Sequence, residues 1–476
     1  MNPRIAIIGA GPTGLGAAYR LQELGYSNWV IYERNPFVGG LASSQTDAAG
    51  FTYDIGGHVM FSHYEYFDRL VDRMLGDDFQ SLMRESWIWM CDRWIPYPLQ
   101  NNIRHLPPDV LLECLDGLVD AQHLDPGDTG NFGDWVHAVF GAGIARHFMR
   151  PYNFKVWAHP LEMMSKRWIA ERVSVIDLKR VLANVVLQRD ELSWGPNNTF
   201  KYPLHGGTGG LYERFLPYVR DHLQLNRELV EVDTEIKRLR FADGGEDRYD
   251  VLLTALPLPE LLRILRPIPG HLVDAVRGLH HSHGLVVGVG VARPCETSKC
   301  WTYFPESSSP FYRVTFLSNY SPRIAPEGHM LLLTETSYSQ HKTEDRATIV
   351  DRVVDGLVAT RLLRPEDRDL IVTTHTEEVE YFYPVPTLTR DAALAQIQPY
   401  LLAHDIYSRG RFGAWCYEIS NMDHSVMQGV EVVDFLLEGT PEATWQAPPS
   451  PVLRIETAAE PADLADLADP VEAGST

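Results

Sequence analysis

The start of the chain contains the pattern that most constrains the fold. Residues 5–8 (Ile-Ala-Ile-Ile) form a short apolar run, and the glycine-rich turn 9–14 (Gly-Ala-Gly-Pro-Thr-Gly) follows at once. Residues 15–24 then have helical spacing, and residues 29–32 (Trp-Val-Ile-Tyr) form a second apolar run that delivers Glu33 at its end. A buried strand, a tight turn into a helix and a second strand make a βαβ unit. The pattern therefore predicts a parallel sheet around the first strand.

The three glycines of this turn predict the class of ligand. Gly9 permits the tight turn, Gly11 lets a pyrophosphate approach the backbone, and Gly14 lets the helix pack close to the sheet. The N-terminus of the helix then faces the negative phosphates. Glu33 can accept both hydroxyls of a ribose and would repel a 2′-phosphate, so the pattern predicts FAD or NAD rather than NADP. The alternative is a glycine-rich turn that holds no ligand.

Two further glycine pairs favour FAD. They lie in residues 39–42 (Gly-Gly-Leu-Ala) and 54–58 (Asp-Ile-Gly-Gly-His), where tight turns let backbone N–H groups meet a long cofactor. Glycine pairs in this order resemble the two-dinucleotide-binding flavoproteins of the amine oxidase type, in which FAD lies extended along the start of the chain. The cofactor-binding residues expected in this part of the chain are Gly9, Gly11, Thr13, Gly14, Glu33, Gly40, Leu41, Gly56 and Gly57. The likeness to known flavoproteins adds Leu229, Arg411, Asn421, Met422 and Ser425 to this expectation.

The rest of the chain divides into regions of different pattern. Amphipathic helical stretches are expected at residues 110–118, 132–140 and 169–187. A small meander of strands is expected at 229–240 with a turn at Gly244-Gly245, and further strands at 249–255, 284–291 and 330–334.

The predicted fold class is α/β. We expect a Rossmann-type FAD-binding domain from residues 1–103, 200–280 and 405–438, with a helical insertion at 104–199. Residues 281–404 are expected to form a mixed or antiparallel sheet domain that contributes to the substrate site. Residues 439–476 contain six prolines, seven acids and one arginine, and are expected to be a disordered tail.

Charge and cysteine content narrow the classes of partner. The chain has 42 basic and 63 acidic residues, a formal charge of −21, which disfavours binding to nucleic acid or to an anionic membrane. Five scattered cysteines fit no disulfide framework and favour a reducing compartment, with the cytoplasm as the expected location. No apolar run reaches the roughly 20 residues that span a bilayer. A homo-oligomer is compatible with this composition.

Several longer motifs resemble one family. Residues 97–102 (Tyr-Pro-Leu-Gln-Asn-Asn), 149–157 (Met-Arg-Pro-Tyr-Asn-Phe-Lys-Val-Trp), 194–197 (Trp-Gly-Pro-Asn) and 409–413 (Arg-Gly-Arg-Phe-Gly), with the Gly-Gly-His-Val of residues 56–59, look like the UDP-galactopyranose mutase family. The likeness is greater to its eukaryotic form, and it covers roughly residues 4 to 438.

The resemblance implies an isomerase that interconverts UDP-galactopyranose and UDP-galactofuranose without net redox change. In that family the FAD must be reduced, and its N5 attacks the anomeric carbon while UDP leaves. The flavin carries the chemistry, so the protein positions the reactants, neutralises charge and excludes oxygen and water. NADPH is the implied reductant. Because Glu33 belongs to the FAD site, its rejection of a 2′-phosphate does not conflict with NADPH.

The resemblance also assigns site residues. Arg172 and Arg313 match the arginines that bind the pyrophosphate, and His58 matches a histidine next to flavin N5. NADPH is expected at Arg84 and Ser86, with Arg411 nearby. The expected substrate-binding residues are Tyr97, Leu99, Gln100, Asn153, Trp157, Asn197, Trp301, Tyr303, Tyr320, Tyr383 and Tyr417. Each has a plainer alternative: an arginine can be a surface group, an aromatic can be core, and His58 can cap a turn.

Departures from the family motifs leave the substrate open. Leu99 stands where an aromatic commonly lies beside the uracil, Ser193 replaces an asparagine, and Met422 replaces a polar residue near the flavin. Losing one aromatic face weakens stacking by roughly 0.5–1.5 kcal/mol, which changes affinity without abolishing a site. The alternatives are the same chemistry on another nucleotide sugar, such as UDP-arabinopyranose, an FAD oxidoreductase of the amine oxidase type, and a nucleotide-sugar binder without activity. The histidines at 280–283 lack a nearby carboxylate or cysteine at ligand spacing, so no metal is predicted there.

Overall fold

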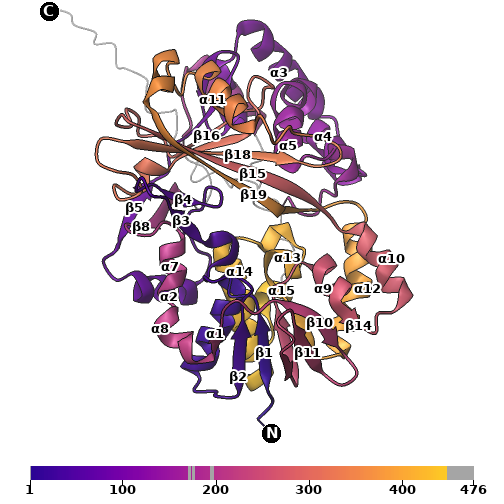
Figure 1. Cartoon of the computed structure of the whole chain (residues 1–476). Coiled ribbons are helices and arrows are strands. Elements are labelled where there is room, and N and C mark those ends of the chain that lie inside the picture. Colours follow the sequence, from indigo (N-terminus) through magenta and orange to yellow (C-terminus); the bar gives the residue numbers. More distant parts are fainter. Residues whose placement is uncertain (1, 170–172, 174–176, 193–197, 447–476) are drawn as a thin grey trace, which may run out of the picture.

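The computed structural model describes residues 2–169, 173, 177–192 and 198–446. Five parallel strands form the first sheet, in the order β20 (Ile406–Ser408), β13 (Val251–Thr254), β1 (Ile5–Ile8), β2 (Trp29–Tyr32) and β9 (Leu223–Gln224). The predicted βαβ unit is confirmed, because α1 (Pro12–Glu23) connects β1 to its parallel neighbour β2. This sheet lies in the lower half of Figure 1.

Alternate residues of β1 face two different cores. Ile5 and Ile7 pack with α1, α2 (Glu65–Leu75) and α14 (Met422–Glu438) on one face of the sheet. Ala6 and Ile8 pack on the other face against the predicted meander and against α9 (Leu258–Ile264) and α12 (Arg390–Ala403). A parallel strand covered on both faces is expected to be apolar throughout, as this one is.

The meander forms a separate four-stranded sheet. Its order is β12 (Glu246–Arg248), β11 (Arg238–Phe241), β10 (Leu229–Asp233) and β14 (Leu265–Arg266). The prediction is confirmed except at its second strand. The expected second run covers residues 236–240, but Lys237 has a φ of 51° and lies in the turn, so β11 begins at Arg238.

Close packing of α1 against α14 requires glycine. A Cβ on Gly16 would lie 2.5 Å from the carbonyl oxygen of Val426, and one on Gly429 would lie 2.0 Å from that of Thr13. The backbones of the two helices therefore nearly touch. The first turn of α1 and the first turn of α14 are consequently held together, at the carboxyl edge of the parallel sheet.

The third sheet is large, and it crosses the upper half of the molecule in Figure 1. Its order is β19 (Ile371–Val385), β15 (His280–Val291), β18 (Met330–Tyr338), β17 (Arg313–Phe316), β16 (Trp301–Tyr303), β6 (Ser86–Met90) and β7 (Arg93–Pro96). Strands β6 and β7 come from residues that the sequence placed in the FAD-binding domain. They join this sheet because β6 pairs in parallel with β16.

The helical region covers one side of this sheet. It contains α3 (Pro108–Ala121), α4 (Phe132–Ile144), a π-helix at Ala145–Met149, α5 (Arg150–Trp157) and α6 (Leu178–Val186). Of the helix expected from 169 to 187, the described residues form α6, and residues 170–172 and 174–176 lie outside the described residues. Asp177 is the N-cap of α6, since its side chain accepts the backbone N–H groups of Lys179 and Arg180.

The remaining elements connect these layers. They are β3 (Ser44–Thr46), β4 (Thr52–Asp54), β5 (Phe79–Met83), β8 (Thr199–Pro203), α7 (Gly209–Glu213), α8 (Leu216–Val219), α10 (Gly270–Ala275), α11 (Ile349–Ala359), α13 (Gly410–Gly413) and α15 (Ala443–Gln446). The short helix α15 falls in the segment predicted to be a disordered tail. Residues 439–446 instead pack on α14, and Glu442 is buried. Over the residues described here, no helix has the length and apolar character needed to cross a membrane.

Candidate active site

A cavity of about 330 Å³ lies between the large sheet, α5 and the turn that follows β4. Most of the residues expected from the sequence to form the site line it. They are Gly56, Gly57, His58, Arg84, Tyr97, Gln100, Asn153, Trp157, Trp301, Tyr303, Arg313, Tyr383, Arg411, Tyr417, Asn421 and Met422. These residues come from distant parts of the chain, and the fold brings them together around this cavity.

Arg313 is held by a carboxylate that the sequence did not reveal. Its Nε donates to Oε1 of Glu335 at 2.7 Å and its Nη2 donates to Oε2 at 2.8 Å. The two residues face each other across β17 and β18, where they are register partners. Arg313 Nη1 makes no hydrogen bond to any residue in the described part of the chain. The guanidinium is therefore fixed on one edge and has a further nitrogen for another acceptor.

Glu335 also fixes other walls of the cavity. Its side chain is 1% exposed, and it accepts the backbone N–H of Gly57 at 2.9 Å and the hydroxyl of Tyr312 at 2.6 Å. The Tyr312 hydroxyl lies 3.1 Å from that of Tyr383. One buried carboxylate thus joins the arginine, the glycine turn and two tyrosines. The role of Glu335 follows from its register with Arg313, which cannot be read from the sequence without knowing how the strands pair.

The electrostatics of this group keep Arg313 charged. Burial lowers the pKa of Arg313, but the negative charge of Glu335 outweighs this and raises it well above its ordinary value. Burial raises the pKa of Tyr383 to about 12, so its phenol stays protonated and can donate a hydrogen bond. The cavity therefore offers a fixed cation and neutral donors, which suits an anion such as a diphosphate.

His58 follows the glycine pair and lines the same cavity. Burial, with smaller contributions from the positive charges of Arg411 and Arg313, lowers the pKa of His58 to about 3. The ring is therefore neutral at physiological pH. Its Nδ1 is buried and has no hydrogen-bond partner among the described residues. An unpaired buried nitrogen in a cavity wall is suited to meet a bound ligand.

One end of the cavity is aromatic. The guanidinium of Arg84 lies 4.8 Å from the ring centre of Tyr97 and 4.9 Å from that of Trp301, and its Nε donates to the hydroxyl of Ser86 at 3.1 Å. Trp301 donates its indole N–H to the hydroxyl of Tyr303 at 2.6 Å. Flat rings and a stacked guanidinium are typical of a surface that binds a planar base.

Another part of the cavity wall is built from three rings on different elements. Trp157, at the end of α5, lies 4.7 Å from Tyr417 and 5.7 Å from Tyr383 between ring centres, both in edge-on or tilted contacts. Nearby, Asn153 donates from Nδ2 to the carbonyl oxygen of Met149 at 2.8 Å, which turns its side-chain oxygen away from the helix backbone. These contacts fix the side chains before any ligand binds.

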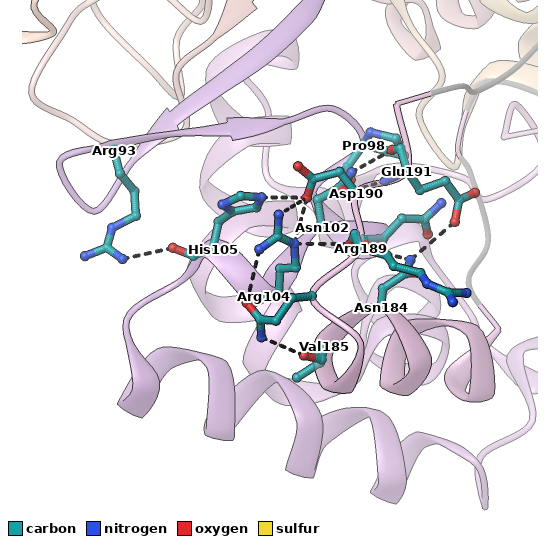
Figure 2. A network of polar contacts seen from close by, with 12 residues as sticks. Arg93, Pro98, Asn102, Arg104, His105, Asn184, Val185, Arg189, Asp190 and Glu191 are labelled. Atoms are coloured by element: carbon teal, nitrogen blue, oxygen red, sulfur yellow. Dashed lines mark hydrogen bonds and ion pairs between the residues drawn. The ribbon is translucent and has the colours of Figure 1, made fainter.

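The turn that carries Tyr97 and Gln100 is attached to residues 188–191 by the polar network in Figure 2. Asn102 is fully buried, and its side chain accepts the N–H of Glu191 at 2.9 Å and donates to the carbonyl of Glu191 at 2.8 Å. It donates further to the carbonyl oxygen of Pro98 at 3.0 Å. A single amide therefore connects both segments.

Charged residues strengthen this network at its exposed edge. Arg104 donates from Nε to Asp190 at 2.7 Å and to the carbonyl of Arg189 at 3.1 Å. His105 Nε2 contacts the same Asp190 oxygen at 2.7 Å (Figure 2). We therefore interpret residues 97–105 and 184–191 as one supporting unit beneath the aromatic end of the cavity.

The residues predicted to hold the dinucleotide fit that group. Helix α1 has no side-chain cap and no acidic residue in its first turn, so its N-terminus can receive a phosphate. Glu33 is buried at the end of β2, where it accepts the N–H groups of Ala10 and Asn35 at 2.8 and 2.9 Å and keeps acceptor capacity for a ribose. Ser43 follows the turn at Gly40, and its hydroxyl is buried without a partner in the described structure. A bound dinucleotide would supply these missing contacts.

Several expected site residues lie elsewhere. Leu99 is fully buried in the core of the helical region, and Leu229 is buried in β10. Tyr320 packs against Phe200 and Tyr202 and does not line the cavity. Thr13 and Ser425 lie in the first turns of α1 and α14, and Leu41 lies in the turn before β3. Arg172 and Asn197 lie outside the described residues.

A second cluster has the composition of a metal site. His63, Asp423 and His424 offer ligand atoms within 4.8 Å of one another, and the histidines at 280–283 belong to no such group among the described residues. Asp423 Oδ2 lies 2.7 Å from Nδ1 of His63 and accepts its backbone N–H at 3.1 Å. These are hydrogen-bond distances, so we interpret the cluster as a fastening between the segment after His58 and the start of α14.

Comparison with known proteins identifies the family. Residues 12–430 match the family model described as flavin containing amine oxidoreductase. A crystal structure of reduced UDP-galactopyranose mutase superposes with a TM-score of 0.91 and 44% sequence identity, covering 94% of this chain and 97% of that one. The chain belongs to the UDP-galactopyranose mutases, within the flavin-containing amine oxidoreductases. It is a flavoprotein of mixed α/β fold, as the sequence predicted.

Other known proteins match this mutase either at lower sequence identity or over a smaller part of the chain. A putative protoporphyrinogen oxidase from an Exiguobacterium species superposes with a TM-score of 0.71 at 17% identity, covering 92% of this chain and 99% of that one, which shows the shared fold alone. The probable zeta-carotene desaturase of Synechococcus elongatus is 46% identical over 308 residues, which are 55% of this chain and 60% of the relative. A diapophytoene desaturase of Staphylococcus haemolyticus is 26% identical over 302 residues, which are 56% of this chain and 57% of the relative. The chain thus spans about 60% of the length of these curated relatives.

Proposed function

We propose that this protein is an isomerase that interconverts UDP-galactopyranose and UDP-galactofuranose. The observation that carries the proposal is the fixed, charged Arg313 beside the neutral His58 in one cavity, in a chain that is 44% identical to a UDP-galactopyranose mutase over nearly its whole length. When bound and reduced, the flavin supplies the nucleophile for the anomeric carbon of the sugar.

Different residues of the cavity are proposed to bind different parts of the substrate. Arg313 is proposed to hold the diphosphate through the edge that Glu335 leaves available, and Tyr383 and Tyr417 are proposed to donate hydrogen bonds to its oxygens. The charge that develops on the departing UDP would thereby be neutralised. Arg172 is proposed as a second cation on sequence alone, because it lies outside the described residues.

The aromatic end is proposed to hold the base. Tyr97 and Gln100 lie on the turn fastened by Asn102, and they would contact the uracil ring. Asn153 and Trp157 line the part of the cavity next to α5, where the sugar and the diphosphate are proposed to lie, with Asn197 assigned there on sequence alone. Because Leu99 is buried in the core, it is not proposed as a direct contact to the base.

NADPH is proposed as the physiological reductant. Arg84 lies at the cavity wall with its Nε bonded to Ser86, and a guanidinium is well suited to recognise the 2′-phosphate of NADPH. Arg411, which lies beside Tyr383 and donates to the carbonyl of Ser420, is proposed to contact the flavin end. The cytoplasm is the proposed location, because the five scattered cysteines are all free, which suits a reducing compartment.

A screen of nucleotide sugars tests this function against its alternatives. Reduced enzyme is incubated without oxygen with UDP-galactopyranose, UDP-arabinopyranose and UDP-glucose, and furanose products are separated by chromatography. We expect conversion of UDP-galactopyranose. Conversion of UDP-arabinopyranose alone would retain the chemistry and change the substrate. Stoichiometric peroxide formation from an amine in air, with no furanose from any sugar, would indicate an oxidase of the same superfamily.

A further inference from the structure

The end of the described chain is joined to the flavin side of the molecule by a buried ion pair. Arg409 is 1% exposed, and it donates from Nε and Nη2 to the two carboxylate oxygens of Glu442 at 2.6 and 2.7 Å. Glu442 is 4% exposed. The indole of Trp445 covers the guanidinium, with its ring centre 4.4 Å away. We name residues 442–445 the C-terminal latch.

Two more contacts fix the latch. Thr444 donates its backbone N–H to Glu431 on α14 at 2.7 Å, and its hydroxyl contacts the other oxygen of Glu431 at 2.8 Å. The same hydroxyl lies 2.9 Å from the phenol oxygen of Tyr64. The latch therefore spans from α14 to the segment that begins α2. Its ion pair is sequestered from water, which is a geometry that fixes position more than it adds stability.

The two residues after Arg409 lie next to the expected flavin site. The N–H of Arg409 bonds to the carbonyl of Thr254, at the carboxyl end of β13. Gly410 follows, with a φ of 83°, and donates its N–H to Gln428 on α14 at 2.8 Å. A Cβ on Gly410 would lie 2.4 Å from the hydroxyl oxygen of Thr13, in the first turn of α1. Arg411 then reaches the cavity wall.

We propose that Glu442 is a positioning residue for the flavin site. It neutralises Arg409 and thereby holds Gly410 against the first turn of α1 and Arg411 at the cavity. Removing one partner leaves a buried charge unpaired, and the backbone at residues 409–411 must then move to bring that charge to water. The proposal rests on the flavin site described above, and it does not depend on which sugar is the substrate.

Flavin release from the holoenzyme tests the proposal. Diluted holoenzyme releases flavin, whose fluorescence gives the dissociation constant, measured at a temperature where thermal denaturation shows every variant to be folded. We expect Glu442→Gln to raise this constant by roughly tenfold or more. Glu438→Gln is the matched control, since Glu438 is exposed at the end of α14 and forms no ion pair with any described residue. A chain ending at Gly439 should behave like Glu442→Gln, and one ending at Gln446 like the full chain.

A double variant separates positioning from ordinary stability. In Arg409→Met/Glu442→Leu neither charge is present, so no unpaired charge forces residues 409–411 to move towards water. Flavin affinity should therefore recover to within about threefold of the parent. If Glu442→Gln does not fold, Glu442→Asp retains the charge on a shorter side chain and should show the same weakening to a smaller degree. The proposal is overturned if Glu442→Gln or the chain ending at Gly439 holds flavin as tightly as the parent. Because flavin affinity is measured without substrate, inactivity towards UDP-galactopyranose would reject the proposed function and leave this result intact.

Discussion

Arg313 and Glu335 form a two-point ion pair across neighbouring strands, with Nε–Oε1 and Nη2–Oε2 distances of 2.7 and 2.8 Å. The Glu335 side chain is almost fully buried, whereas the Arg313 side chain is 23% exposed and lines the cavity. A charge fixed in this way is oriented before the diphosphate arrives. The reorganisation that a flexible cation would need during the reaction is thereby avoided.

Glu335→Gln should therefore impair catalysis more than folding. An amide offers one acceptor where the carboxylate offers two, so the guanidinium turns and the N–H of Gly57 loses a charged partner. We expect kcat/KM to fall by about 100-fold, as judged by steady-state assays of reduced enzyme. Glu344→Gln is the control, because Glu344 is likewise a buried carboxylate in ion pairs, in its case with Lys342 and Arg352, and it does not line the cavity. Equal losses in the two variants would show that Glu335 has no special role.

Asn102→Ala should weaken substrate binding through the network of Figure 2. The substitution removes the amide that bridges Glu191 and Pro98, so the turn bearing Tyr97 and Gln100 loses its support. We expect KM for the nucleotide sugar to rise by roughly tenfold with a smaller change in kcat. Gln188→Ala removes two exposed contacts, to Arg104 and to the carbonyl of Val185, but leaves the Asn102 bridge in place, so it should change both constants much less. An unaltered KM in Asn102→Ala would exclude this supporting role.

Arg84→Met should abolish discrimination between NADPH and NADH. The guanidinium is proposed to pair with the 2′-phosphate, which NADH lacks, while the methionine keeps much of the apolar contact with Tyr97 and Trp301. Stopped-flow reduction should show the NADPH rate falling by about tenfold or more towards the NADH rate, with the NADH rate little changed. A parallel loss with both nucleotides would mean that Arg84 acts through the general shape of the cavity.

His58 should make the protein less stable in acid. Its folded pKa of about 3 lies below its ordinary value of 6.5, so between these values the unfolded chain binds the proton and the folded protein does not. The free energy of unfolding therefore falls as the pH drops through this window. Between pH 7 and 5, the parent should lose about 2 kcal/mol more than His58→Gln. Urea unfolding at both pH values measures this, with His271→Gln on the exposed surface of α10 as the control. Equal losses in parent and His58→Gln would refute the shift.

Local patterns carried the predictions that the structure confirmed. The βαβ unit depends on residues within one short segment, and the glycine spacing between Gly9 and Gly14 reports a packing constraint directly: a Cβ on Gly14 would lie 1.9 Å from the carbonyl oxygen of Gly9. The start of α6 was not predicted, because the apolar spacing in the sequence already begins before Asp177. The N-cap at Asp177 decides where this helix begins.

Long-range pairs account for what the sequence did not reveal. Glu335 lies in a buried strand and belongs to no motif, and its importance comes from the register of β17 and β18. Glu442 lies in a segment whose average composition is that of a disordered tail, yet it is held by its pairing with Arg409, and Thr444 is held by Glu431 and Tyr64. Composition describes a segment as a whole, whereas a few specific partners are enough to fix part of it.

The most direct test of the central claim is the conversion of UDP-galactopyranose by this enzyme with its flavin reduced by dithionite under nitrogen. Chromatography should show UDP-galactofuranose forming until equilibrium is reached, over many turnovers for each flavin, with the flavin still reduced at the end. The air-oxidised enzyme should form none. Absence of the furanose from the reduced enzyme, or its formation only in proportion to flavin oxidised, would contradict the account.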